Sequence, residues 1–355
     1  MAAACIAFAQ TRDPLPVPDL PGYKTLKADF HMHTVFSDGE VWPATRVTEA
    51  WRDGLDVIAI TDHYTYNPHY ADVKVDVARP YEIARAAAGR TGIIVISGVE
   101  IMQGDLHTNA LFMRDANAVL GLDFLSALRE ANKQGAFVQW NHPGWKAPLK
   151  EPIPPLTTAF GEKLIQGVEI VNGPDYYADA HPWTEANHLA LTANSDIHAP
   201  ITAEYAPRKR PVTLVFAKTR DAAGVRDALF ARRTAGWMND QLWGAEEYLR
   251  GIWQAAVTVE PSTLQFTAKA RGSAITLRNT SGIPFKPRVG KTPDWLYVEA
   301  AEVPAERIAA MHVSIAKTAP AGSHRVNLEL EITNLHTGPG RNLIVRLPVE
   351  ISIEP

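Results

Sequence analysis

Residues 55–63 read LDVIAITDH, and the fold class of this chain can be argued outward from them. Residues 55–60 form a mostly apolar run of strand length, which is typical of a strand covered on both faces of a parallel sheet. A helix that begins near Pro43 precedes the run, and Gly54 ends that helix. The polar residues Thr61, Asp62 and His63 follow at once. The stretch therefore predicts a buried strand with titratable side chains at its carboxyl end.

The same order recurs on both sides of this stretch. Strand-like runs cover residues 24–30, 93–97, 136–140, 167–171 and 211–217. Helical stretches lie between them, including residues 122–134 and a helix over about 219–232 for which Thr219 is the expected N-cap. Repeated strand–helix units predict a parallel sheet or a closed α/β barrel, in which ligands bind at the carboxyl ends of the strands.

A different pattern begins after about residue 255. Short strand-like runs separated by turn-rich segments such as Asn279–Gly282 fill the rest of the chain. This density of short strands is typical of a small immunoglobulin-like sandwich. We therefore expect an N-terminal extension over residues 1–23, a barrel over 24–254 and a β-sandwich domain over 255–355.

Composition excludes several classes of protein. The formal net charge is -4 and the single cysteine, Cys5, allows neither an intramolecular disulfide nor a cysteine zinc site. A basic excess that would suit duplex nucleic acid is absent from the sequence, and no apolar run reaches the roughly 18 residues of a membrane span. A small molecule is the expected partner, and the sequence leaves a homo-oligomer open.

The first ten residues, MAAACIAFAQ, leave the location of the protein open. Ala7, Phe8 and Ala9 match the small-x-small pattern of a signal-peptidase site, yet the stretch is short and lacks a basic start. One interpretation is the tail of an export signal, which predicts an exported or periplasmic protein. The other is an ordinary N-terminal tail, which predicts a cytoplasmic one.

Six histidines and three acids lie beside the ends of the strand-like runs. They are His31, His33, Asp38, His63, Glu100, His107, His142, Asp196 and His198. His31 and His33 are two residues apart, so on a strand both imidazoles point to one face and reach one ion. A lone histidine at a strand end is usually a packed residue. Nine titratable groups in one topological place indicate a metal site instead, because such groups are costly to bury unless they are paired or bind metal.

On these residues the chain resembles the PHP (polymerase and histidinol phosphatase) family of phosphoesterases. The resemblance covers about residues 24–255 and rests on HMHT at 31–34, SDG at 37–39, TDH at 61–63, GVE at 98–100, His107, NHP at 141–143 and DIH at 196–198. All nine ligand positions are filled, with Asp38 where some members carry a histidine. The resemblance implies a distorted (β/α)7 barrel and a site for three divalent metal ions.

The resemblance also implies which residues hold each ion. His31, His33, Glu100 and Asp196 would hold the first, and Glu100 would bridge to a second completed by His107 and His142. Asp38, His63 and His198 would hold the third. Imidazole and carboxylate ligands suit manganese, zinc or iron, of which we favour manganese. Glu100, Asp196 and His198 are the expected catalytic residues of a hydrolysis carried out by a metal-bridging hydroxide.

A second resemblance concerns the substrate. A PHP barrel with a C-terminal sandwich, together with RPVTLVFA at 210–217, is similar to exported bacterial phosphodiesterases of this family, some of which act on organophosphate diesters. It implies hydrolysis of phosphodiesters of small organic alcohols or phenols. A phosphomonoesterase of the histidinol-phosphate or nucleotide type remains the alternative, as does a non-catalytic, metal-stabilised binding protein. The residues expected to bind substrate are Tyr64, Trp145, Asn172, Arg208 and Arg210.

Overall fold

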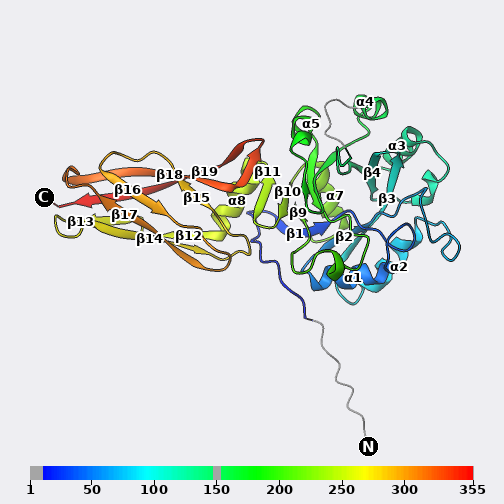
Figure 1. Ribbon diagram of the computed structural model, residues 1–355, viewed down its shortest axis with the longest axis horizontal. Helices are drawn as coiled ribbons and strands as arrows, with labels where there is room; N and C mark the ends of the chain where they lie inside the picture. The colour runs from blue at the N-terminus through cyan, green and yellow to red at the C-terminus, as the bar shows by residue number, and fades with distance from the viewer. Residues whose placement is uncertain (1–10, 147–152, 355) are drawn as a thin grey trace, which may run out of the picture.

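The computed structural model of the protein describes residues 11–146 and 153–354. It has two lobes along one long axis, a barrel built from the N-terminal two thirds and an all-β lobe built from the rest (Figure 1). The expected signal-peptidase pattern at residues 7–9 falls outside the described residues. Among the described residues, no helix combines the length and apolar character that a membrane span needs.

The first strands of the barrel follow the predicted strand–helix order. β1 (Lys24–Asp29), β2 (Val57–Ile60) and β3 (Ile94–Gln103) pair side by side in parallel. The connecting helices are α1 (Pro43–Arg52) and α2 (Arg79–Ala88), and each has a proline in its first turn, where a missing N–H costs nothing. Gly54 has φ +82 between α1 and β2, and a side chain there would collide with the Asp13 carbonyl oxygen.

β3 is longer than the sequence indicates. Its first half pairs with β2. After its second half the chain turns at Gly104 and runs back as β4 (Leu106–Leu111), which pairs antiparallel with that second half. β4 pairs antiparallel with β5 (Phe137–Trp140). The helix α3 (Phe124–Lys133) lies between them in sequence and begins at Asp123, whose carboxylate accepts a hydrogen bond from the Ser126 N–H.

The barrel is closed partly by side chains. β6 (Gly167–Asn172) pairs in parallel with β5 and β8 (Ala190–Asn194), and antiparallel with the short β7 (Asp175–Tyr176). β9 (Val212–Ala217) pairs antiparallel with β1. Thr213 on β9 accepts from the Ala193 N–H and donates to the Ala193 carbonyl, both at 2.9 Å, and Asn194 Oδ1 accepts from the Phe30 N–H. These contacts join β8 to β9 and to the residue that follows β1.

The remaining described helices of the barrel lobe range from 3 to 11 residues. They are η1 (Ala116–Val119), α4 (Pro154–Gly161), η2 (Ala178–Ala180), α5 (His181–Ala186), α6 (Ile201–Glu204), α7 (Ala222–Phe230) and α8 (Glu246–Ala256). The predicted N-cap Thr219 is wrong for α7. The Asp221 carboxylate accepts from the Gly224 N–H at 2.7 Å, and the Thr219 hydroxyl donates to Asp221. A carboxylate is the better acceptor there because the helix N-terminus carries partial positive charge.

Two sheets form the C-terminal lobe. One has the order β12 (Val257–Glu260), β14 (Gly272–Asn279), β17 (Ile308–Ile315) and β16 (Leu296–Ala300). The other contains β13 (Thr263–Phe266), β19 (Arg341–Ile353), β18 (Gly322–Gly338) and β15 (Pro287–Val289). Alternate residues such as Ile275 and Leu277 point into the core between them. The predicted fold class, an α/β barrel followed by a β-sandwich, is thereby confirmed.

One sheet runs through both lobes. β10 (Thr234–Met238) pairs with β9 and with β11 (Gln241–Gly244), and β11 pairs in parallel with the barrel-facing end of β18. The long strands β18 and β19 span the sandwich from its tip to the barrel (Figure 1). α8 crosses the expected boundary at residue 254, so the division into 24–254 and 255–355 stays a prediction.

Candidate metal centre

The two histidines after β1 share one side of the chain. Met32 lies between them, pairs with Ile197 as a parallel bridge and is fully buried in the apolar core. His31 and His33 therefore point to the opposite side, into the barrel. Both are buried, and their Nε2 atoms each lie 3.0 Å from Asp196 Oδ1. The backbone around Asp196 is held next to them because the Asp196 N–H donates to the His31 carbonyl.

Glu100 lies at the centre of the constellation. Its Oε2 atom is 3.3 Å from His31 Nε2, 3.2 Å from His33 Nε2 and 3.0 Å from His63 Nδ1. Its Oε1 atom accepts from Asn141 and lies 3.1 Å from His107 Nδ1 and 3.6 Å from His142 Nε2. The two oxygens of one carboxylate thus face two different sets of imidazoles.

The expectation that all nine residues lie at strand ends is wrong for Glu100 and His107. Glu100 lies inside β3, and His107 is the second residue of the antiparallel strand β4. The hairpin forms because β3 continues past the end of β2 and takes β4 as its new partner. The hairpin register pairs His107 with Met102, so the turn returns His107 to the neighbourhood of Glu100.

Asp38 reaches the site from the turn after His33. Its Oδ1 lies 3.3 Å from His198 Nε2, and its Oδ2 lies 3.6 Å from His63 Nε2. Asp62 holds this turn, since its carboxylate accepts from the Thr34 N–H, the Thr34 hydroxyl and the Ser37 hydroxyl at 2.6–2.7 Å. Asp62 thus stabilises the segment that carries Asp38.

The donor set fits divalent metal ions. Several buried nitrogen and oxygen atoms in the described part of the centre have no hydrogen-bond partner; they are His31 Nε2, His33 Nε2, Asp38 Oδ1, His63 Nδ1, Glu100 Oε2, His142 Nδ1 and Asp196 Oδ1. Buried polar atoms normally have a partner, so this concentration is unusual. Ligand atoms gather within 4.8 Å of one another in overlapping groups, among them His31–His142–Asp196 and His33–Asp38–His63–His198. Imidazole and carboxylate donors of this kind suit first-row divalent ions.

The histidines and carboxylates of the centre shift one another's pKa values, because opposite charges lie close together in a buried site. Burial alone would lower the pKa of His63, but Glu100 and Asp38 outweigh it and raise the pKa to about 10. Burial would raise the pKa of Asp196, yet the neighbouring His31 and His33 hold it far below its usual range. The carboxylates are therefore ionised at neutral pH, which is the form that binds metal.

Glu169 is a residue of the centre that the sequence analysis missed. It is fully buried in β6, and its carboxylate lies 3.1 Å from His31 Nδ1. The signal was available in the run at residues 167–171, where a single acid interrupts an otherwise apolar strand. A buried carboxylate needs a partner of its own, so an acid in such a strand indicates a paired or functional group.

A cavity of about 470 Å³ opens above the histidines. Trp145 and Asn172 line it as predicted, and Asn172 donates to Asp196 Oδ2 at 3.1 Å. Tyr66 and Tyr177 also line it, and we call Tyr66, Trp145 and Tyr177 the aromatic rim. The Trp145 ring stands 5.5 Å from the His142 ring, and the Tyr66 ring 6.1 Å from the His63 ring. The rim thus borders the centre on two sides.

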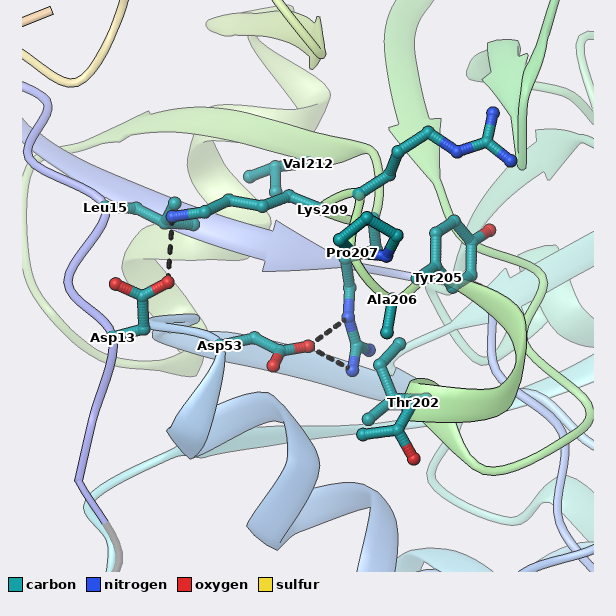
Figure 2. Close-up of a pocket in the computed structure, with 12 residues that line it drawn as sticks. Asp13, Leu15, Asp53, Thr202, Tyr205, Ala206, Pro207, Lys209 and Val212 are labelled. Carbon is teal, nitrogen blue, oxygen red and sulfur yellow. Dashed lines mark hydrogen bonds and ion pairs between the residues drawn. The ribbon is translucent and has the colours of Figure 1, made fainter.

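The other three expected substrate residues do not line this cavity. Tyr64 is buried, and its hydroxyl donates to the carbonyls of Met102 and Leu122. Arg208 and Arg210 line a separate cavity of about 190 Å³. Figure 2 shows this second cavity. The dashed lines from Asp53 mark its contacts with the Arg210 guanidinium group.

Burial explains why Arg210 is not available to a phosphate. Its Nη2 lies 2.7 Å from Asp53 and its Nη1 lies 3.3 Å from Asp29, so two carboxylates already neutralise it. A buried guanidinium requires such partners. Tyr64, Arg208 and Arg210 thus lie outside the cavity above the histidines.

The barrel, the β-sandwich and the buried cluster of histidines and carboxylates are together typical of a class of metal-binding proteins with two lobes. The PHP domain model matches residues 29–196. A two-domain protein from Bacteroides vulgatus, described as containing a predicted PHP-like metal-dependent phosphoesterase, is 35% identical with a TM-score of 0.88, covering 96% of this chain and 100% of that one. The chain belongs to the PHP domain family.

Two relatives from Methanocaldococcus jannaschii match parts of the chain. One uncharacterized protein is 25% identical over 181 residues, which is 47% of this chain and 90% of the relative. A second is 38% identical over 76 residues, which is 21% of this chain and 34% of the relative.

Proposed function

We propose that the protein is a metal-dependent phosphoesterase that hydrolyses phosphodiesters of small organic alcohols or phenols at a centre of three divalent ions. The observation that carries the proposal is the set of buried histidine and carboxylate atoms that converge without hydrogen bonds to one another. The description of the Bacteroides vulgatus relative as a PHP-like metal-dependent phosphoesterase supports the reaction class.

The ligand assignment is the one that the resemblance to the PHP family implies. His31, His33, Glu100 and Asp196 would hold the first ion; Glu100, His107 and His142 would hold the second; and Asp38, His63 and His198 would hold the third. Glu100 points Oε2 towards His31 and His33 and Oε1 towards His107, and this orientation suits a carboxylate shared by two ions. The donor set is compatible with manganese, zinc or iron, and we favour manganese. When bound, the ions supply activated water and neutralise charge on phosphoryl oxygens.

Asp196, His198 and Tyr177 line the cavity and can contact the substrate there. The side chains of Asp196 and His198 are 20% and 36% exposed, so both are accessible to an incoming phosphoryl group. The His198 Nδ1–H donates to the Asp196 carbonyl at 2.7 Å, which turns Nε2 towards Asp38. Burial raises the pKa of the Tyr177 hydroxyl, and the nearby Asp175 adds to it, so this side chain is a neutral donor at neutral pH. Together with Glu100, Asp196 and His198 are the proposed catalytic residues.

The lining of the cavity favours a diester over a monoester. Lys146 is the one lysine or arginine among the described residues that line it, and it already pairs with Asp105. A monoester dianion needs more positive charge than a diester monoanion does. The half-exposed rings of Tyr66 and Trp145 provide apolar surface for an alkyl or aryl group.

The test compares an activated aryl phosphodiester with the matching monoester, using metal-stripped protein reloaded with manganese or zinc. We expect metal-dependent turnover with a preference for the diester, and loss of that turnover in His31→Ala and Asp196→Ala proteins. His312→Ala, on an exposed position of β17, is the control and retains activity.

Each other outcome has a distinct meaning. A preference for the monoester moves the assignment to a phosphomonoesterase. Turnover of neither ester by protein that binds its ions rejects this substrate class and favours a non-catalytic, metal-stabilised protein. Failure of the wild-type protein to bind divalent ions rejects the metal centre.

A further inference from the structure

Glu169 accepts hydrogen bonds from four different parts of the barrel. Its Oε1 accepts from Asn194 Nδ2 at 2.9 Å, and its Oε2 accepts from Asn172 Nδ2 at 2.8 Å. The His142 N–H donates to Oε2 at 2.9 Å, and His31 Nδ1 lies 3.1 Å from Oε1. These partners follow or end four strands, β1, β5, β6 and β8. One fully buried carboxylate thus connects four strand ends beneath the cavity.

The contact with His31 decides which ring nitrogen carries the proton. A carboxylate at Nδ1 requires an Nδ1–H donor, so the neutral ring has its lone pair on Nε2. That atom lies 3.0 Å from Asp196 Oδ1 and 3.3 Å from Glu100 Oε2, on the side where the other ligand atoms gather. Glu169 therefore holds His31 in the tautomer that can bind a metal ion.

The contact with His142 acts on the backbone. His142 has φ 28, a left-handed conformation that residues with a side chain rarely adopt. Such a residue costs on the order of 1–3 kcal/mol and persists only when its surroundings hold it in place. The hydrogen bond from the His142 N–H to Glu169 supplies such a restraint. It fixes the direction in which the imidazole leaves the chain.

Glu169 supports three of the nine proposed ligands. It touches His31 and His142 directly and Asp196 through Asn172, which donates to both Glu169 and Asp196. These three residues form one of the compact ligand groups of the centre. The group around Asp38 has a different support, because Asp62 binds the turn that carries it.

We propose that Glu169 is the positioning residue for His31 and Asp196, proposed ligands of the first ion, and for His142, a proposed ligand of the second. The inference rests on the proposed metal centre and adds to it that Glu169 orders ligands of the first and second ions, whereas Asp62 orders the turn that carries Asp38, a ligand of the third. All the groups that face Glu169 are donors, so its full acceptor capacity is used. An amide at this position would turn a donor towards a donor in either orientation.

The experiment measures metal binding and the His31 tautomer without substrate, so it is independent of which ester the enzyme cleaves. Metal-stripped wild-type, Glu169→Gln and Asp62→Asn proteins are titrated with manganese and zinc, and bound ions per chain are counted. We expect Glu169→Gln to weaken binding of the first and second ions by roughly 10- to 100-fold while leaving the third ion, at Asp38, bound. Asp62→Asn should show the reverse.

A spectroscopic signature separates positioning from general destabilisation. Nitrogen-15 NMR of the zinc-loaded wild-type protein should show a His31 Nδ1–H, and Glu169→Gln should lose that signal or shift it. Glu169→Asp, which keeps the charge, should recover part of the affinity. Because Glu169→Gln could fail to fold, Asn172→Ala is the second variant. It removes the link to Asp196 from a half-buried position and should weaken binding of the first ion.

Two results would overturn the proposal. One is unchanged affinity for every ion in folded Glu169→Gln and Asn172→Ala proteins. The other is an equal loss of all ions in Glu169→Gln and Asp62→Asn, which would make both residues general supports of the barrel. If the wild-type protein binds its ions but cleaves neither ester, the proposed reaction fails and the role of Glu169 stands.

Discussion

At the scale of the single residue, Gly39 decides whether the turn that carries Asp38 can form. A Cβ atom at this position would lie 2.5 Å from both the His33 carbonyl carbon and the Thr34 nitrogen. These are backbone atoms and cannot turn away as a side chain can. The turn also depends on the Gly39 N–H, which donates to the Thr34 carbonyl at 3.0 Å.

We therefore predict that Gly39→Ala lowers the free energy of unfolding by about 1–3 kcal/mol, the usual cost of overpacking. It should also weaken the ion held by Asp38. Urea denaturation and metal titration measure the two effects. Gly161→Ala is the control, because a Cβ there meets no atom within 4 Å. Equal stability of the two variants would contradict the prediction.

Trp145 permits a matched test of the aromatic rim. Trp145 and Trp42 are both 48% exposed, but of the two only Trp145 is among the described residues that line the cavity above the histidines. An aromatic contact is worth about 0.5–1.5 kcal/mol, or roughly a twofold to tenfold change in binding. We predict that Trp145→Ala raises KM for an aryl diester by this factor and leaves KM for a dimethyl diester unchanged. Steady-state kinetics should show no effect of Trp42→Ala, and an equal effect of both variants would argue against the rim.

At the scale of the secondary-structure element, Asp56 joins several segments at the start of β2. Its carboxylate, 2% exposed, lies 2.6 Å from Lys27 on β1, 2.6 Å from Arg220 ahead of α7 and 3.1 Å from Arg12 in the N-terminal segment. Burial alone would raise the pKa of Asp56, but these cations, Lys27 foremost, hold it below its ordinary value. The charge is therefore present at neutral pH and paired on several sides.

We predict that Asp56→Asn lowers the free energy of unfolding at pH 7 by about 3 kcal/mol, because the cations lose a buried partner. Since the folded-state pKa is depressed, the stabilisation is complete above the unfolded-state value near 4 and declines as the pH falls through the lower folded-state value. Urea denaturation at pH 7 and pH 3 should show a smaller difference between the two proteins at pH 3. A difference that grows in acid would contradict the assignment.

At the scale of the whole molecule, the barrel and the sandwich share one sheet and one core. β11 of the barrel lobe pairs with β18, with Trp243 opposite His336. The Trp243 ring stacks on the His336 ring at 5.4 Å, and the Trp253 ring of α8 meets the Phe285 ring at 5.1 Å. Side chains of both lobes, including Leu249 and Leu330, belong to one apolar cluster.

We predict that the two lobes unfold together, because opening the interface would expose this shared apolar surface. Calorimetry of the full chain should give one transition whose van't Hoff and calorimetric enthalpies agree. Trp243→Ala should lower the melting temperature of that single transition. Two separate transitions in the wild-type protein would show that the sandwich is an independent unit.

Much of this arrangement could be predicted from the order of residues along the chain. Apolar runs of strand length predicted the barrel, and the histidines and acids that follow several of these runs predicted the strand ends at which most of the ligands gather. The i, i+2 spacing of His31 and His33 predicted their common direction, because side chains alternate along an extended chain. These features are local, so they could be recognised without knowing which segments are neighbours.

Partners that are distant in sequence were decided by the tertiary structure. The hairpin of β3 and β4 places His107 beside Glu100, and the position of Asp29 and Asp53 removes Arg210 from any phosphate. The role of Glu169 depends on four strand ends that meet only in the folded barrel. A buried charge takes whichever partners the fold brings within about 3 Å, and residue order specifies which groups need partners without specifying which ones they receive.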